Sequence, residues 1–259
     1  MSLIQVEQIG HHYFTPSTAT KALEDVSFSV KEGEFVSFLG PSGCGKTTML
    51  SILAGLITPT SGSIRIDQKK PNKDVHFIGY MLQQDYLFPW KTIEENILLG
   101  LKINGRLNSK TKQQALSFLN QIGLKGVEKQ KPQQLSGGMR QRAALARTMA
   151  VNPKLLLLDE PFSALDYQTK LKLEDLVAEI LKAYGKTAIL VTHDIGEAIS
   201  MSDRILLFSG SPGTIHRTFE VPEELRMLKP FDVRSQESYN QIFQTIWKEL
   251  EALETNRSS

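Results

Sequence analysis

Eight consecutive residues, from Gly40 to Thr47, read GPSGCGKT and fit the pattern G-x-x-x-x-G-K-[ST]. Glycines allow such a loop to wrap a polyphosphate with its N–H groups pointing inward, and Lys46 would add a positive charge at the β- and γ-phosphates. The hydroxyl of Thr47 is placed to reach Mg²⁺. We therefore expect a phosphate-binding loop made of Gly40, Pro41, Ser42, Gly43, Cys44, Gly45, Lys46, Thr47 and Thr48.

Two acidic residues, Asp159 and Glu160, directly follow the apolar run Leu155 to Leu158. We expect Asp159 to bind Mg²⁺, and Glu160 to orient or deprotonate an attacking water. Two acids after a strand also fit a solvated loop. Together with the phosphate-binding loop, however, they predict hydrolysis of a nucleoside triphosphate.

A second stretch, LSGGMRQR at residues 135 to 142, also has the features of an anion site. A serine and two glycines open a predicted helix, whose first N–H groups are unpaired and carry the positive end of the helix dipole. One domain would then hold two phosphate-facing motifs about ninety residues apart. The sequence alone does not say which phosphate the second motif serves.

The elements that must position these motifs are those of an α/β fold. Alternating apolar residues near Ile4 and near Phe28 predict half-buried antiparallel strands. Continuous apolar runs at 35–39, 155–158 and 188–191 are separated by helix-length segments, which predicts a mainly parallel sheet covered on both faces.

Helical periodicity dominates two other segments. We expect a single domain over 1–259, with an α/β core and an antiparallel β subdomain in 1–83 and 151–222, an inserted helical subdomain in 84–150, and a C-terminal helical extension in 223–259. Ser235 is a candidate N-cap for the last helix. Its apolar stripe fits either packing on its own domain, which we favour, or binding to a partner.

Charge and hydropathy exclude some classes of protein. The 30 basic and 28 acidic residues give a net charge of +2 and form no basic stripe, so nucleic acid is not expected as a partner. The N-terminus lacks the charged and apolar pattern of a signal peptide. The apolar stretch 49–57 is far shorter than the roughly 20 residues of a membrane helix, so we expect no segment that crosses a bilayer.

With SALD at 163–166 and VTHD at 191–194, these motifs occur in an order and at spacings that resemble the ATP-binding subunit of ABC transporters. The resemblance covers the chain from about Ile4 to about Glu220. It implies a P-loop NTPase (RecA-like) core, ATP and Mg²⁺ as ligands, and ATPase activity coupled to transport.

The resemblance also implies roles for single residues. In this family two subunits face each other head to tail, so Ser136, Gly137 and Gly138 would face the γ-phosphate bound by the partner chain. Asp166 would cross the same interface. His193 resembles the histidine that contacts the γ-phosphate, and Gln83 the glutamine that reaches Mg²⁺ and the attacking water. On its own, His193 would be interpreted as a structural histidine.

Two aromatic assignments follow from the same resemblance and keep alternatives. Tyr13 resembles the ring that stacks on adenine, although His11, His12 and Phe14 flank it and a core aromatic at a strand end is the alternative. The aromatic rings of the loop at 85–90 fit the groove for a helix of the membrane subunit, or packing within the helical subdomain.

Three sequence motifs resemble those of the ATP-binding subunits of importers for nitrate, sulfonates, taurine and pyrimidine precursors. These motifs are FPW, DEPFSALD and THDIGEAISMSDRI. This implies permease subunits, an extracytoplasmic solute-binding protein, and a peripheral location on the cytoplasmic face of the membrane. Two alternatives stay open: an ABC-type ATPase that acts on DNA or the ribosome, and a regulatory nucleotide sensor. The sequence does not identify the transported solute, because in this family the solute contacts other subunits.

Overall fold

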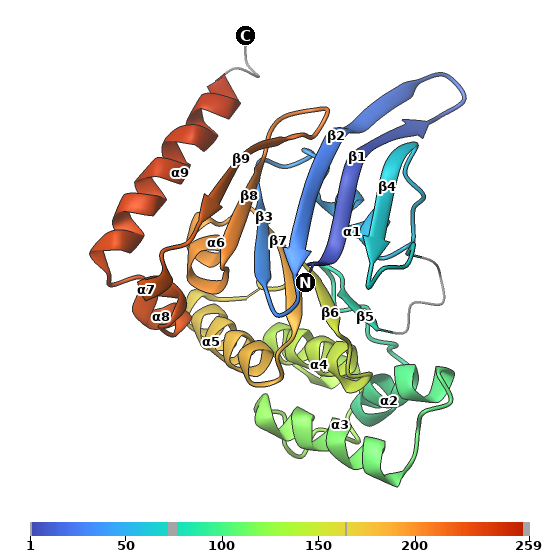
Figure 1. Ribbon diagram of the computed structural model, residues 1–259. Coiled ribbons are helices and arrows are strands. Elements are labelled where there is room, and N and C mark those ends of the chain that lie inside the picture. Colours follow the sequence, from blue (N-terminus) through green and yellow to red (C-terminus); the bar gives the residue numbers. More distant parts are fainter. Residues whose placement is uncertain (1, 72–76, 164, 256–259) are drawn as a thin grey trace.

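The computed structural model describes residues 2–71, 77–163 and 165–255, and it contains two sheets (Figure 1). Ala164 of the SALD motif lies outside the described residues. The smaller sheet is antiparallel, with β1 between its two neighbours. Its strands in spatial order are β2 (Ala19–Lys31), β1 (Ser2–Phe14) and β4 (Ser61–Ile66).

The larger sheet is parallel except for its last pair, β8 and β9. The expected α/β fold with a mainly parallel sheet and an antiparallel β unit is thereby confirmed. Its strands in spatial order are β5 (Ile78–Met81), β6 (Leu155–Asp159), β7 (Thr187–Thr192), β3 (Phe35–Leu39), β8 (Arg204–Phe208) and β9 (Ile215–Glu220).

The residues of β6 show how a continuous apolar strand is buried on both faces of the sheet. Leu155 and Leu157 join the core shared with helix α1 (Lys46–Leu53) and the antiparallel sheet. Leu156 and Leu158 point to the other side, into the core shared with the helices that follow β5. Because alternate side chains point to opposite faces, each strand residue needs an apolar neighbour on its own side.

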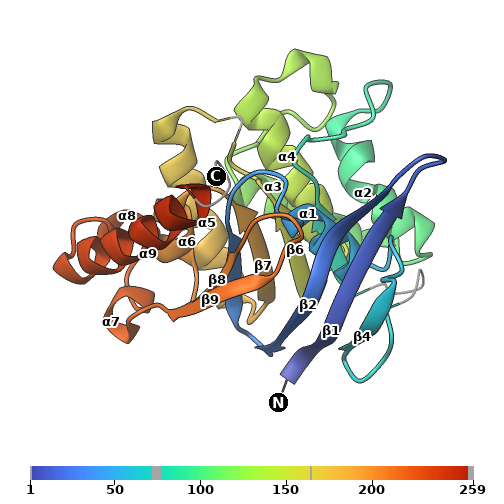
Figure 2. The ribbon, with the colours of Figure 1, turned by 90° about the horizontal axis from the view of Figure 1, so that it is seen from above.

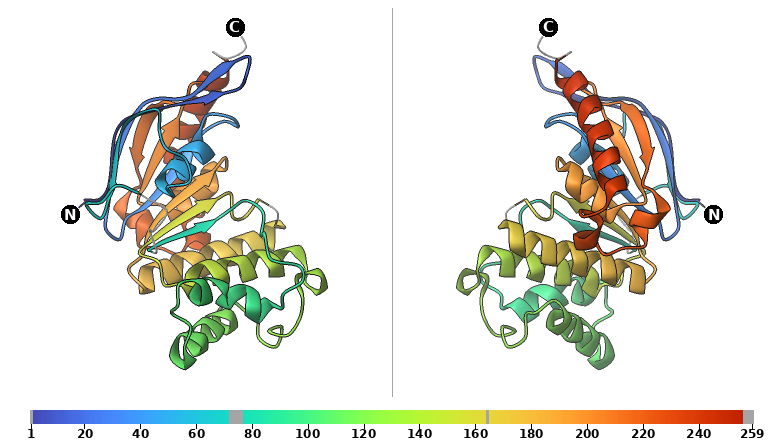
Figure 3. Two further views of the ribbon diagram at one scale, coloured as in Figure 1. Left: turned by 90° about the vertical axis from the view of Figure 1, so that its right-hand side faces the viewer. Right: turned by 90° about the vertical axis from the view of Figure 1, so that its left-hand side faces the viewer.

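The helices of residues 84–150 lie together at one end of the molecule (Figures 1 and 3). Thr92 and Asn108 cap the first two of these helices, each in a reciprocal capping box. The helices are α2 (Ile93–Ile103), α3 (Ser109–Gln121) and α4 (Gly137–Ala150), with a 3₁₀ turn at Pro132–Gln134 before α4. The division of the chain at residues 83, 151 and 223 stays a prediction.

Helix α5 (Tyr167–Ala183) packs most of its buried residues into the core that it shares with α4. The helices that pack with β8 and β9 are α6 (Ile195–Met201), α7 (Glu223–Arg226), α8 (Pro230–Val233) and α9 (Glu237–Thr255). Figure 2 shows α9 running along the outside of this region, beside α6. In the described parts of the chain, no helix is long and apolar enough to cross a membrane.

Helix α9 packs on its own chain, as the favoured interpretation of its apolar stripe predicted. Ile246 is fully buried among residues of α6 and β8, and Ile242 and Leu250 pack against the same core. Trp247 is the exception, with 52% of its surface exposed. The proposed cap at Ser235 is wrong, because α9 begins at Glu237 and the Ser235 hydroxyl donates to the carbonyl of Asp232.

Candidate functional site

The loop between β3 and α1 has the backbone that its glycines allow. Gly40, Gly43 and Gly45 have φ of 152°, 77° and 90°, a region that residues with a Cβ rarely adopt. A Cβ on Gly45 would lie 2.6 Å from Leu23 Cδ2 and 2.8 Å from the Ala22 carbonyl oxygen. The predicted phosphate-binding loop is therefore tightly enclosed by its own chain at this position.

Lys46 begins α1 and turns its side chain back into the loop. Its Nζ donates to the carbonyls of Gly40 (2.6 Å) and Pro41 (2.9 Å), and the residue is 5% exposed. A charged group this buried requires partners, which these carbonyls supply. The ammonium group thereby lies in the loop that would hold the phosphates.

Thr47 and Asp159 meet at the carboxyl end of the sheet. The Thr47 hydroxyl donates to Asp159 Oδ1 at 3.2 Å, and Asp159 is 5% exposed. Burial raises the pKa of Asp159, although the Thr47 hydroxyl opposes the shift. A hydroxyl and a carboxylate are hard oxygen ligands, the chemistry that Mg²⁺ prefers when substrate phosphates complete its coordination. The residues present therefore fit the expected magnesium site.

Glu160 lies between the side chains of Gln83 and His193, which were both predicted to belong to the ATP site. Gln83 Nε2 donates to Glu160 Oε2 at 3.0 Å, and His193 Nδ1 lies 3.2 Å from Glu160 Oε1. The backbone of Glu160 has a φ of 45°, an uncommon value for a residue with a side chain. Its N–H is held by the Val191 carbonyl at 2.9 Å. This conformation brings one carboxylate to two residues from distant parts of the chain.

Most of these groups line one open cavity of about 540 Å³, whereas Gly40, Pro41 and Asp159 do not line it. Tyr13 lies on its wall, 43% exposed, and its hydroxyl is 3.2 Å from Thr48 Oγ1. Among the described residues, His11, His12 and Phe14 are not part of this wall. Among residues 11–14, Tyr13 alone lines this cavity, and its role at adenine stays a prediction. The lining residues also include Ser42 to Thr48, Gln83, Glu160 and His193.

The second phosphate-facing motif does not reach this cavity. Ser136 caps α4, accepting from the N–H of Met139 at 3.3 Å. Asp166 caps α5 in the same way, accepting from the N–H of Thr169 at 3.0 Å. In the described part of the chain, neither these residues nor Gly137 and Gly138 line the cavity around the loop. One chain therefore separates two groups of residues that were both expected to meet ATP.

The aromatic loop before α2 is partly open to solvent. Tyr86 is 57% exposed and Trp90 68% exposed, while Phe88 is half-buried against the Trp90 ring. Arg147 of α4 fixes the loop by donating to the carbonyls of Asp85 and Tyr86, each at 2.7 Å. The two exposed rings are thus presented from a backbone that is held in place.

Some residues at the site were not singled out from the sequence. Ser211, in the turn between β8 and β9, lines the cavity, and Gln141 donates to the carbonyl of Pro161 at 2.6 Å. Burial raises the pKa of Tyr80 to about 12, and the nearby charge of Asp159 acts in the same direction. Gln141 belongs to the quoted LSGGMRQR stretch, so its position carried a signal. Ser211 and Tyr80 carried none.

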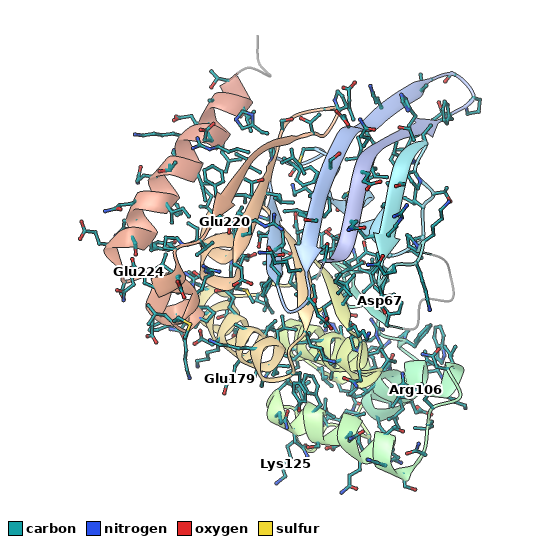
Figure 4. The ribbon with its side chains drawn as sticks, viewed as in Figure 1. Asp67, Arg106, Lys125, Glu179, Glu220 and Glu224 are labelled. Carbon is teal, nitrogen blue, oxygen red and sulfur yellow. The ribbon has the colours of Figure 1, made fainter. Side chains whose placement is uncertain are left out.

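Charged side chains elsewhere are spread over the outside of the molecule. Figure 4 labels examples of both signs, from Lys125 and Arg106 in the helical region to Glu220 and Glu224 beside the C-terminal helices. This distribution agrees with the absence of a basic stripe in the sequence.

The fold and the site together define a P-loop nucleotide-binding protein. A glycine-rich loop joins a buried strand to a helix, and a second strand places an acid pair opposite the loop. This arrangement is the one on which nucleoside triphosphate hydrolysis by P-loop proteins depends.

Comparison with known proteins names the family. The family model described as ABC transporter matches residues 23–163, more than half of the chain. The chain therefore belongs to the ABC transporter family, in which it is an ATP-binding subunit with ATPase activity. It is 61% identical to an uncharacterized ABC transporter ATP-binding protein, YtlC, of Bacillus subtilis, over 98% of each chain.

Relatives with assigned solutes are more distant. The taurine import ATP-binding protein TauB of Pelagibacter ubique is 41% identical, covering 86% of this chain and 84% of its own. The aliphatic sulfonates import ATP-binding protein SsuB of Bacillus anthracis is 39% identical, covering 84% and 85%. Among solved structures, a dimeric post-hydrolysis state of the cassette MJ0796, bound to ADP and Pi, is 35% identical with a TM-score of 0.76, covering 85% of this chain and 99% of its own.

Proposed function

We propose that this chain energises an importer for a small solute of the sulfonate type, as one half of a head-to-tail ATPase dimer. The alternatives within the proposal are the related solutes nitrate, taurine and pyrimidine precursors. The permease and an extracytoplasmic solute-binding protein would be its partners. It would then lie on the cytoplasmic face of the membrane, bound through the permease.

The observation that carries the dimer is the separation of the two phosphate-facing motifs. The loop Gly40–Thr47 shares its cavity with Gln83, Glu160 and His193, but not with Ser136 or Asp166. A second copy placed head to tail would bring its Ser136, Gly137 and Gly138 to the open side of this cavity. The cassette MJ0796 is described as dimeric in two solved structures, which supports the same arrangement.

The predicted site residues have distinct parts in the proposed hydrolysis. Lys46 and the loop N–H groups would bind the β- and γ-phosphates, and Tyr13 would stack on adenine. Thr47, Asp159 and Gln83 would hold Mg²⁺. The metal, when bound, neutralises the charge that develops on the phosphates. Glu160 accepts the proton of the attacking water, oriented by Gln83, while His193 contacts the γ-phosphate.

The import direction and the solute class rest on the relatives. TauB and SsuB are named for taurine and aliphatic sulfonate import, and they match most of this chain. The exposed rings of Tyr86 and Trp90 offer an apolar surface for a helix of the permease. The alternative of a DNA-acting ATPase would need a long coiled coil between the two motifs. Among the described residues of that interval, the longest helix is α3, with 13 residues.

The first test is Glu160→Gln in the full-length chain. Loss of a general base typically lowers the rate by about 10²- to 10⁴-fold, so steady-state ATP turnover should fall by at least that lower amount while ATP binding persists. In saturating ATP and Mg²⁺, the variant should elute from a sizing column as a dimer. Glu179→Gln, an exposed change of the same type on α5 (Figure 4), is the matched control.

Two results would contradict the proposal in different ways. A Glu160→Gln protein that turns over ATP at the wild-type rate would remove Glu160 from the reaction. A variant that stays monomeric in saturating ATP would remove the dimer. The solute class is tested separately, by uptake of labelled taurine or an alkanesulfonate into vesicles that hold this chain together with its permease.

A further inference from the structure

The turn that carries His193 is held from both sides by one lysine of α5. Lys170 Nζ lies 2.6 Å from Asp194 Oδ2 and 2.5 Å from Glu197 Oε1. Asp194 directly follows His193 in the chain, and Thr192 directly precedes His193. The hydroxyl of Thr192 donates to the carboxylate of Glu197. The Lys170 side chain is 16% exposed and that of Glu197 is 5% exposed, whereas that of Asp194 is 41% exposed. The contact between Lys170 and Glu197 is therefore the one that is shielded from water.

The residues of this arrangement also fix one another. Asp194 caps α6 by accepting from the N–H of Glu197 at 3.1 Å, and the Asp194 N–H donates to Thr192 Oγ1 at 3.0 Å. Although burial works against the charged forms, hydrogen bonds to both acids raise the pKa of Lys170, and the Lys170 contact lowers the pKa of Asp194. Near neutral pH both therefore stay charged. The backbone on either side of His193 is thus tied to the lysine.

Lys170 is also close to the segment that the proposed dimer would bury. It lies one turn after Asp166, the residue that caps α5. It lines a small cavity of about 120 Å³ together with Glu160, Ser163 and His193. A shift of α5 at the subunit interface would consequently move the anchor of the His193 turn.

We propose that Lys170 is a positioning residue for ATP hydrolysis, which keeps His193 beside Glu160 by fixing the turn Thr192–Asp194 to the helix that begins at Asp166. The proposal rests on the proposed roles of His193 and Glu160. Lys170 itself does not touch the nucleotide. It acts through the 3.2 Å contact between His193 Nδ1 and Glu160 Oε1.

A second cation lies near α5, one turn beyond Lys170. Glu174 is fully buried there, and its Oε1 has no hydrogen-bond partner in the described part of the chain. Arg234, from the segment after β9, donates to Glu174 Oε2 at 2.6 Å. Burial raises the pKa of Glu174 to about 7, although the charge of Arg234 opposes the shift. Glu174 is thus paired with Arg234, and Lys170 keeps Asp194 and Glu197 as its partners.

The test compares Lys170→Met with Lys172→Met, the same change at an exposed position of α5. Misplacing a reacting group by about 1 Å lowers rates by up to about 10²-fold, so we expect kcat for ATP to fall about 10- to 100-fold in Lys170→Met. The KM for ATP should stay within about threefold, because the loop Gly40–Thr47 is untouched. Lys170→Arg, which keeps the charge, should recover most of kcat.

A double-mutant cycle separates positioning from general stability. In a His193→Ala background, Lys170→Met should cause little further loss of kcat, because the group it positions is gone. If Lys170→Met folds poorly, Asp194→Asn serves instead, since asparagine still caps a helix while removing one charged partner of Lys170.

Three results would be decisive. Full kcat in Lys170→Met, or equal losses in the wild-type and His193→Ala backgrounds, would overturn the positioning role. Wild-type turnover in His193→Ala alone would instead overturn the proposed function of the site.

Discussion

The two phosphate-facing segments of this chain differ in how far the chain itself encloses them. In the loop Gly40–Thr47, a Cβ on Gly45 would collide with Leu23 and Ala22, and Lys46 occupies the interior of the loop. At the start of α4, the nearest group that a Cβ on Gly137 would meet, among the residues that the structure describes, is a side-chain nitrogen of Arg140 at 4.0 Å. The first segment is closed by its own chain, and the second is open.

Glycine is present in the two segments for different reasons. At Gly45 the backbone conformation and the neighbours both exclude a side chain. Gly137 is the first residue of a regular helix, where alanine is the more stable choice, and it is not among the residues with positive φ. Nothing in the described chain requires glycine there, which supports contact with a group from outside.

The largest effect is expected when the closed segment is broken. In Lys46→Ala, the loop loses its buried cation, and loss of a buried charged partner typically costs about 2–5 kcal/mol. We therefore expect kcat/KM for ATP to fall by about 10³-fold. The affinity of the monomer for ATP at equilibrium should fall as well. Lys125→Ala, on the exposed surface of the helical region (Figure 4), should change neither. Retained monomer affinity in Lys46→Ala would contradict the assignment of the loop.

A smaller effect, of a different kind, is expected at the open segment. Ser136→Arg should lower ATP turnover by about 10²-fold, because it blocks the phosphate of the partner subunit, while ATP binding to the monomer persists. The change also removes a helix cap, which costs about 1 kcal/mol of stability. Asn108→Arg, which removes the cap of α3, controls for that loss and should leave turnover unchanged. Weakened monomer binding in Ser136→Arg would place this segment on the chain's own nucleotide.

The smallest effect is expected for Gly137→Ala, which adds only a methyl group to the open segment. Gly137→Ala should leave the fold intact and raise the free energy of unfolding by up to about 0.5–1 kcal/mol, while lowering turnover by about tenfold. Denaturant unfolding and steady-state ATPase assays measure the two quantities. Gly138→Ala is less favourable for folding, because its Cβ would lie 3.3 Å from Leu165 and 3.4 Å from Thr169. Unchanged turnover in Gly137→Ala would mean that no outside group approaches there.

The sequence predicted those parts of the fold and site whose signals are local. Continuous apolar runs predicted β3, β6 and β7, and their spacing predicted that the sheet is mainly parallel, but not the order of its strands. The GPSGCGKT pattern and the acid pair Asp159–Glu160 lie at the ends of these strands, so strand pairing alone brings them together. Ser136 was recognised as a helix start from the two glycines that follow it.

Long-range packing decided the rest. Ser211 reaches the cavity only because the β8–β9 turn folds over the loop, and no residue near Ser211 signals this in the sequence. Lys170 looked like one of several lysines on an amphipathic helix until its partners, 24 and 27 positions further on, were placed beside it. The cap at Ser235 was misplaced because two short helices, α7 and α8, precede α9 and their ends resemble loop sequence.

The two tryptophans of the chain belong to elements on opposite sides of the molecule, because Trp90 precedes α2 and Trp247 is in α9 (Figure 1). Trp90 is 68% exposed in the aromatic loop before α2, and Trp247 is 52% exposed on α9. Since indole emission shifts to shorter wavelength when the ring leaves water, each surface carries its own optical reporter. A Trp247→Phe chain would report by fluorescence only on the loop proposed to meet the permease, and a Trp90→Phe chain only on the C-terminal helix.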